Sequence, residues 1–233
     1  MSFAGKVALV TGASGNLGRA VADAFVAAGA QVALVDHARR DGGPADDGTR
    51  FRVEADLRDE GSTRAAADAV FSRFGRIDVL CNVAGGFAAG TPVHETPDPL
   101  WHRMFDLNAM SVVNTARAVV PRMIAAGQGR IVNVAAAASQ HGQAGMAAYA
   151  VAKNGVVRLT ESMAAELRGH GIGVTCVLPT LIDTPQNRAA MPAADTSQWT
   201  PPEAIAAVVV FLASDAALIM SGASVPLSGR PRS

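Results

Sequence analysis

Two residues with complementary chemistry stand four positions apart in one short segment of the chain. Tyr149 and Lys153 occur in the run Ala-Ala-Tyr-Ala-Val-Ala-Lys, and residues at i and i+4 project from the same face of a helix. A neighbouring ammonium favours the phenolate, so we expect Lys153 to lower the pKa of Tyr149 and to make it a usable acid or base near neutral pH. Taken alone, the pair also fits an exposed tyrosine beside a solvated lysine.

A glycine-rich turn supplies a second kind of chemistry. The segment Thr11-Gly-Ala-Ser-Gly-Asn-Leu-Gly18 lies between an apolar stretch at 7–10 and an amphipathic stretch at 17–28. Glycines permit a tight turn and let the backbone approach a pyrophosphate, which then meets the N-terminus of the following helix. The placement between a strand and a helix predicts a dinucleotide site.

Asp36 indicates which dinucleotide the site prefers. It ends the second apolar stretch, 18 residues after Gly18. A carboxylate there accepts hydrogen bonds from the adenosine ribose and repels a 2′-phosphate, which favours NAD over NADP. Arg39 and Arg40 follow closely, and they leave NADP open as the less favoured alternative.

Strand-like and helix-like segments alternate along the whole chain. Apolar runs without in/out alternation are typical of parallel strands that are covered on both faces. Such runs occur at 7–10, 32–35, 77–81, 131–134 and 174–178, with weaker candidates at 50–54 and 223–227, where Pro226 favours an edge or a strand end. Helical patterns occur at 17–28, 63–74, 101–126, 147–168 and 202–213, while 86–99, 181–200 and 39–49 read as loops. The alternation predicts one α/β domain over residues 1–233, a doubly wound, Rossmann-like parallel sheet with helices on both faces.

Composition narrows the possible partners. The chain has 233 residues, 49% of them hydrophobic and 17% charged, with a net charge of zero. The lack of a basic block argues against nucleic acid, and no apolar run is long enough to cross a membrane. Cys81 and Cys176 lie far apart in apolar runs, so we expect buried thiols of a reducing compartment rather than a disulfide or a metal site. The N-terminus shows no targeting pattern, and we expect a cytoplasmic protein.

The ordered motifs resemble those of the short-chain dehydrogenase/reductase superfamily over nearly the whole chain. Asn16 stands where that family has the second glycine of its turn, with Gly15 one place earlier. Asp56, in Ala-Asp-Leu57, matches the family residue that holds the adenine amine, and Asn108 matches the helical Asn that shapes a water relay to the catalytic Lys. The resemblance implies NAD(P) binding by the following residues: Gly12, Ser14, Asn16, Leu17, Gly18, Asp36, Asp56, Leu57, Asn82, Ala84, Gly85, Tyr149, Lys153, Pro179, Ile182 and Thr184.

The chain departs from this family at Ala136. Thirteen residues before the Tyr, the family has a Ser whose hydroxyl steadies charge on the substrate oxygen, and here the run is Val134-Ala-Ala-Ala-Ala-Ser139. Ser139 lies three positions too late to take that place directly. The loop residues His141 and Gln143 are candidate replacement donors.

Residues 178–202 are similar to the corresponding region of the dihydropteridine reductase branch, which also has Ala in place of the Ser. This resemblance implies hydride transfer to a conjugated imine or a cyclic carbonyl, with Tyr149, Lys153 and Asn108 as the catalytic residues. Two alternatives stand beside it: an alcohol dehydrogenase or ketoreductase that uses His141 or Gln143, and a non-catalytic NAD(H)-binding protein. We expect a small-molecule substrate held by Phe87, His141, Gln143, Met146 and Trp199, no metal, and a homodimer or homotetramer as is usual in the family.

Overall fold

Seven parallel strands form one sheet at the centre of the molecule. The computed structural model describes residues 1–37 and 46–229. The strand order is β3-β2-β1-β4-β5-β6-β7. The strands are β1 (Val7–Thr11), β2 (Gln31–Asp36), β3 (Arg50–Glu54), β4 (Val79–Asn82), β5 (Gly129–Val134), β6 (Ile172–Pro179) and β7 (Ser224–Leu227). The order runs outward in both directions from β1 and β4, so a crevice opens between the carboxyl ends of these two strands.

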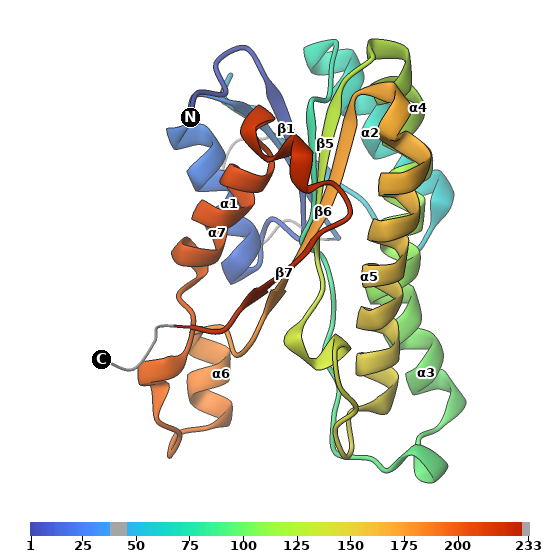
Figure 1. The fold of residues 1–233 in the computed structure, drawn as a ribbon, viewed down its shortest axis with the longest axis vertical. Coiled ribbons are helices and arrows are strands. Elements are labelled where there is room, and N and C mark those ends of the chain that lie inside the picture. The colour runs from blue at the N-terminus through green and yellow to red at the C-terminus, as the bar shows by residue number, and fades with distance from the viewer. Residues whose placement is uncertain (38–45, 230–233) are drawn as a thin grey trace.

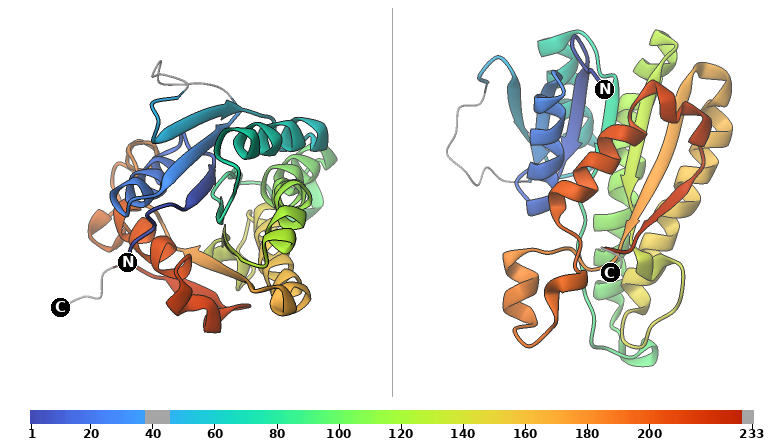
Figure 2. Two further views of the ribbon diagram at one scale, coloured as in Figure 1. Left: turned by 90° about the horizontal axis from the view of Figure 1, so that it is seen from above. Right: turned by 60° about the vertical axis from the view of Figure 1, so that its left-hand side comes forward.

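Helices cover both faces of the sheet (Figure 1). Helices α1 (Asn16–Ala27) and α7 (Pro202–Leu212) lie on one face, and α2 (Glu60–Phe74), α4 (Ser111–Ala126) and α5 (Ala147–Leu167) lie on the other. Helix α3 (Asp98–Phe105) leads into α4, and the short helix α6 (Pro185–Ala190) follows β6. Figures 1 and 2 place α6, and the loops before α3 and α5, at the end of the sheet where the strands finish.

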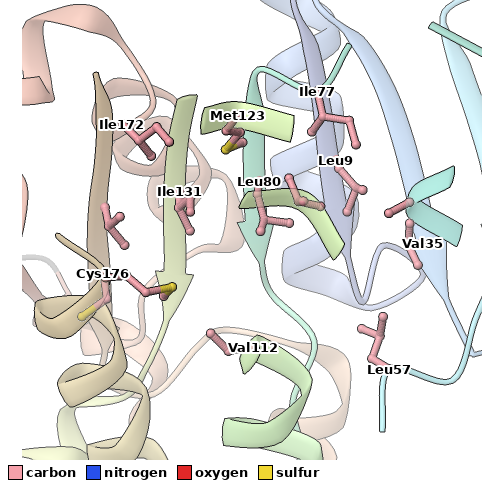
Figure 3. Packing of buried hydrophobic residues seen from close by; sticks show 14 of the residues in the cluster. Leu9, Val35, Leu57, Ile77, Leu80, Val112, Met123, Ile131, Ile172 and Cys176 are labelled. Atoms are coloured by element: carbon pink, nitrogen blue, oxygen red, sulfur yellow. The ribbon is translucent and has the colours of Figure 1, made fainter. Parts of the chain in front are cut away.

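The core consists of two apolar layers, one on each face of the sheet. Leu9, Leu80 and Ile131 point toward α2, α4 and α5, where Met123 packs against them (Figure 3). Their strand neighbours on the other face, Val10 and Val132 among them, pack against α1 and α7. Because both faces are covered, successive residues of the central strands are buried, and the continuous apolar runs in the sequence follow from this.

The strand predictions are confirmed, including the weaker ones. The stretches at 50–54 and 223–227 form β3 and β7, and Pro226 lies on the edge strand β7. Both cysteines are buried and free. No helix among residues 1–37 and 46–229 is long and apolar enough to span a bilayer.

Two predictions about helices and loops are wrong. The stretch at 101–126 is not one regular α-helix, because a π-helical turn at Asp106–Met110 separates α3 from α4. The expected loop at 181–200 contains α6, which Thr184 caps by accepting a hydrogen bond from the Asn187 backbone N–H. Most of the predicted 39–49 loop lies outside the described residues.

Candidate active site

The turn between β1 and α1 is shaped by contacts that leave no room for side chains. Gly12 has a φ of +63°, and a Cβ on it would lie 2.8 Å from the Cα of Ala84. A Cβ on Gly18 would lie 2.1 Å from the carbonyl oxygen of Gly12. The hydroxyl of Thr11 accepts hydrogen bonds from the backbone N–H groups of Val83 (3.0 Å) and Ala84 (3.1 Å). The turn is therefore clamped against the residues that follow β4.

A groove of about 580 Å³ runs along this edge of the sheet. Many of the predicted cofactor residues line it: Gly12, Asn16, Leu17, Gly18, Asp36, Asp56, Leu57, Ala84, Gly85 and Thr184. A glycine cradle beside a helix N-terminus suits a pyrophosphate, and a carboxylate at the end of β2 suits a ribose. The residues present thus fit a dinucleotide.

Two carboxylates in the groove, those of Asp36 and Asp56, already have protein partners. Asp36 accepts hydrogen bonds from the backbone N–H groups of Ser14 (2.8 Å) and His37 (2.7 Å). Each carboxylate oxygen can accept more than one hydrogen bond, so Asp36 retains capacity for a ligand hydroxyl. Asp56 accepts from the guanidinium of Arg58, whose hydrogen bonds lower the pKa of that carboxyl to about 2. Arg39 and Arg40 lie outside the described residues.

Four more of the predicted cofactor residues lie outside the lining of the groove. Ser14 serves through its backbone as a donor to Asp36. Pro179 ends β6, and the carbonyl of Ile182 accepts from the Asn187 side chain. The structure does not bring the Asn82 side chain into the groove, because it is 3% exposed and bonded within the core.

Asn16, which departs from the family pattern, makes a long-range contact. Its side-chain N–H donates to Oε1 of Gln186 on α6 at 2.7 Å. Asn16 and Thr184 both line the groove. The hydrogen bond therefore joins the glycine-rich turn to α6 across one end of the groove, and we call this contact the α6 clasp.

Lys153 is held by the sheet rather than by Tyr149. Its Nζ donates to the carbonyl oxygen of Val134 at 2.8 Å, and the residue is 5% exposed. Burial lowers the pKa of Lys153 to about 8 and raises the pKa of Tyr149 to about 12. The expectation that Lys153 lowers the tyrosine pKa is therefore wrong for this structure, because burial raises that pKa.

Asn108, the predicted relay residue, and Lys153 both lie close to Gly85. Asn108 occupies the π-helical turn, where its side chain accepts from the N–H of Gly86 (3.2 Å) and donates to the carbonyl of Met104 (2.8 Å). A Cβ on Gly85 would lie 2.7 Å from Oδ1 of Asn108 and 3.1 Å from Nζ of Lys153. Asn108 and Lys153 therefore meet at Gly85, at the groove.

No hydroxyl occupies the place of the family serine. Ala136 is buried at the end of β5, and Ser139 donates through its Oγ to the carbonyl oxygen of Ala136 at 2.6 Å. The Ser139 carbonyl accepts from the Asn154 side chain. These contacts stabilise the turn after β5, and the Ser139 hydroxyl proton is used in the bond to Ala136.

The predicted substrate residues lie on three separate segments of the chain, and Phe87 contacts Tyr149. The Phe87 ring is 63% exposed and meets the Tyr149 ring edge to face, with centroids 5.0 Å apart. His141 and Gln143 are exposed on the loop before α5, and Met146 is half-buried. A hydrogen bond from the Gly90 N–H to the Gly145 carbonyl joins the two loops. Trp199 is buried in the segment after α6.

Several groove residues escape prediction from the sequence. His37, Arg58, Arg103, Leu107 and Ser111 line the groove, and Gln186 closes the clasp. Arg58 had a readable signal, because it follows Asp56 by two residues with opposite charge. Gln186 had none, since its partner is 170 residues away.

Comparison with known proteins gives matches over almost the whole chain. The model of the short chain dehydrogenase family matches residues 6–195. D-threitol dehydrogenase of Mycolicibacterium smegmatis is 37% identical, covering 97% of this chain and 92% of the relative. Cis-4-hydroxycyclohexanecarboxylate dehydrogenase of Sinomonas cyclohexanicum is 36% identical, covering 98% and 97%. The crystal structure of an NAD⁺-bound xylitol dehydrogenase superposes with a TM-score of 0.90 at 28% identity, covering 99% and 100%.

Proposed function

The chain belongs to the short chain dehydrogenase family, and on that premise we propose that it is an NAD(H)-dependent oxidoreductase that interconverts a small cyclic carbonyl and its alcohol. The observation that carries the proposal is the meeting of Lys153 and Asn108 at Gly85, in the lining of a groove that fits a dinucleotide, with Tyr149 one helical turn before Lys153 on α5. NADH, when bound, supplies the hydride. The preference for NAD over NADP is supported by Asp36, whose charge opposes a 2′-phosphate.

Tyr149 is the proton donor in this proposal. Its raised pKa keeps the phenol protonated at neutral pH, so Oη holds the proton that a reduced carbonyl oxygen needs. Lys153 lies one turn further along α5 with its Nζ anchored on Val134, where the ammonium can bind a ribose hydroxyl. Asn108 fixes the Gly86 backbone near Lys153, and in this proposal it supports the proton relay.

The names of the relatives support an alcohol or ketone as the substrate. Two of them are dehydrogenases of hydroxyl compounds, a tetritol and a hydroxycyclohexane. A ring is favoured over a linear polyol by the exposed Phe87 ring at Tyr149, because such a surface offers apolar contact and few hydrogen bonds. His141 or Gln143 would then supply the second donor to the substrate oxygen.

A second candidate is favoured by one specific observation, the alanine at position 136. A conjugated imine, such as the quinonoid form of a dihydropteridine, accepts hydride without leaving a charged oxygen to be stabilised. The absence of the serine hydroxyl would therefore not reduce transition-state stabilisation with such a substrate.

A panel of substrates separates the candidates. NADH oxidation is followed with cyclic ketones, with linear ketoses and with quinonoid dihydropterin. Turnover that is fastest with cyclic ketones supports the proposal, and turnover with dihydropterin alone supports the second candidate. Tight NADH binding without any turnover would instead indicate a non-catalytic dinucleotide-binding protein.

Replacing Tyr149 with Phe removes the proton donor and leaves the ring contact with Phe87 intact. We expect turnover to fall by about 10²-fold or more, with NADH affinity little changed. Steady-state kinetics and NADH fluorescence titration measure the two quantities. Turnover equal to that of the unmodified protein would rule out the assigned role of Tyr149.

The proposal also includes a cytoplasmic location and a homo-oligomeric state. Two buried free thiols suit a reducing cytoplasm. Val151 on α5 and Phe105 on α3 expose 56% and 46% of their surface, which suits burial between subunits of a homodimer or homotetramer. Light scattering gives the mass in solution, and a monomer at micromolar concentration would contradict this part.

A further inference from the structure

A chain of hydrogen-bonded side chains crosses the interior of the molecule behind the active site. Thr115 on α4 donates to Oδ1 of Asn82 (2.8 Å), and Asn82 donates to Oδ1 of Asn133 (2.8 Å). Asn133 donates in turn to Oγ1 of Thr160 on α5 (2.9 Å), which donates to the carbonyl of Val156 (2.8 Å). The four side chains belong to residues that are 0–3% exposed, and we call them the buried amide chain.

The buried amide chain interrupts two otherwise apolar strands. Asn82 and Asn133 are direct neighbours in the register of β4 and β5. Residues such as Leu80 and Ile131, two positions earlier on the same face, pack in the apolar layer under α4 and α5. Burying two amides among them is unfavourable unless the amides are hydrogen-bonded, and here each amide accepts one hydrogen bond and donates another. The arrangement therefore specifies one position of each helix against the sheet.

Helix α5 is anchored to β5 at two places. Asn133 holds Thr160, and the next residue of the strand, Val134, accepts from Nζ of Lys153. Thr160 follows Lys153 by seven residues, close to two full turns, so both side chains leave the helix from the same stripe. Rotating or sliding α5 would break both contacts together.

The other end of the buried amide chain reaches the cofactor groove. Asn82 is the last residue of β4, and the next residues, Val83 and Ala84, donate to Thr11 at the glycine-rich turn. The buried amide chain thus connects the floor of the groove with the helix that carries Tyr149 and Lys153.

We propose that Asn133 and Thr160 are positioning residues that hold Tyr149 and Lys153 in register with the dinucleotide groove. The inference rests on the proposed function, because it assigns these residues to the NADH site. Neither side chain reaches the groove itself, so their effect must pass through α5 and β4.

Thr160→Val tests the proposal. The substitution keeps the volume of the side chain and leaves Nδ2 of Asn133 without its acceptor. Two readouts are needed: the Kd for NADH alone, by fluorescence, and the ionisation of Tyr149, the single tyrosine of the chain. We expect Kd to rise roughly tenfold and the phenolate titration to shift to lower pH, because a displaced α5 leaves Tyr149 less buried.

Two variants serve as matched controls. Thr160→Ser keeps the hydroxyl, and we expect it to restore both readouts. Thr175→Val removes a buried hydroxyl on the adjacent strand β6 that has no hydrogen-bond partner, and we expect it to change neither. If Thr160→Val does not fold, Thr160→Cys replaces it, since a thiol is a weaker acceptor, and a smaller shift of the same sign is expected.

The outcomes separate this inference from the proposed function. If the unmodified protein does not bind NADH, the proposed function fails. If it binds NADH, and Thr160→Val lowers the urea midpoint but leaves both Kd and the Tyr149 titration unchanged, the buried amide chain is structural only and the inference is overturned.

Discussion

Tyr149 is the single tyrosine of the chain, so its ionisation can be followed by phenolate absorbance in the unmodified protein. Its surroundings are largely apolar: the Phe87 ring lies at its edge, and Lys153 is turned toward Val134. Desolvation therefore governs its titration, and the phenol is poised as an acid rather than as a base. At neutral pH the phenol therefore carries the proton that a reductive step needs.

The first prediction concerns the titration of Tyr149. We expect the native protein to form phenolate with a midpoint near pH 12, and the urea-unfolded chain near its ordinary value of about 10. A rapid pH jump with absorbance detection measures the native value before any alkaline unfolding. The Tyr149→Phe variant supplies the baseline, and a native midpoint below 10 would restore the idea that Lys153 activates the tyrosine.

The same shift has a consequence for stability. The folded-state pKa is raised, so between pH 10 and 12 the native state retains a proton that the unfolded chain has lost. The contribution of Tyr149 to the free energy of unfolding is fully present below pH 10 and declines as the pH rises toward 12. Urea unfolding of the unmodified protein and of Tyr149→Phe across this range should diverge accordingly.

Ala136→Ser distinguishes the two substrate classes. The site is buried at the end of β5 with extended backbone, which any residue adopts. With a carbonyl substrate, we expect the added hydroxyl to raise kcat/KM by about tenfold or more through charge stabilisation on oxygen. With an imine, no gain is expected. Kinetics of both proteins on the best ketone and on quinonoid dihydropterin make the comparison.

At the scale of elements, α6 depends on few contacts. Its six residues are too short to be stable alone. The Thr184 cap, the ion pair between Asp183 and Arg188, and the α6 clasp hold it in place. Because the clasp spans one end of the groove, its strength should influence how quickly a dinucleotide leaves.

Breaking the clasp should speed the release of NADH. Asn16→Ala and Gln186→Ala each remove one partner of an exposed hydrogen bond worth roughly 0.5–1 kcal/mol. We expect the dissociation rate of NADH to rise by about two- to fivefold in either variant, and stopped-flow displacement measures it. The double variant should be no faster than the single ones, and additive effects would contradict a direct coupling.

The elements that could be predicted are those with a strong local signal. The five clear strands were readable because burial on both faces leaves continuous apolar runs. The π-helical turn at Asp106–Met110 was not, since the apolar pattern of 101–126 continues through it. Helix α6 left a weaker signal, the Thr184-Pro185 pair of a capping residue followed by proline at the first helical position.

In the site, spacing predicted which side chains share a face but not what they contact. The i, i+4 rule places Tyr149 and Lys153 together, yet the partner of Lys153 is the backbone carbonyl of Val134. Backbone partners of this kind depend on how α5 docks on β5, and they cannot be predicted from the identity of any side chain.

At the scale of the whole molecule, the parallel sheet gathers distant segments at one edge. The groove is lined by residues from Gly12 to Thr184, and all of the strands point their carboxyl ends toward it. Charge at this edge is mixed, with Asp36 and Asp56 beside Arg58 and Arg103. Because the groove is built from segments along most of the chain, dinucleotide binding should raise the free energy of unfolding of the whole fold rather than order one loop.

Thermal unfolding tests this expectation and the choice of cofactor. NADH at about one hundred times its Kd adds about 2.7 kcal/mol to the free energy of unfolding, which corresponds to a rise in Tm of roughly 5–10 °C for a chain of this size. We expect NADPH at the same concentration to give a smaller rise, because Asp36 opposes its 2′-phosphate. Asp36→Asn should narrow the difference, and an equal rise with both cofactors in the unmodified protein would contradict the assignment of NAD.

The exposed position of α6 also makes the chain open to cleavage by trypsin at Arg188. Arg188 is the only arginine or lysine between Arg168 and the last four residues, so trypsin has a single target in that stretch. Cleavage there would separate α7 and β7 from the remainder, although β7 pairs with β6 and α7 packs beside α1. The cleaved protein should elute as one species in gel filtration until it is denatured. The rate of cleavage at Arg188 then measures how often α6 opens.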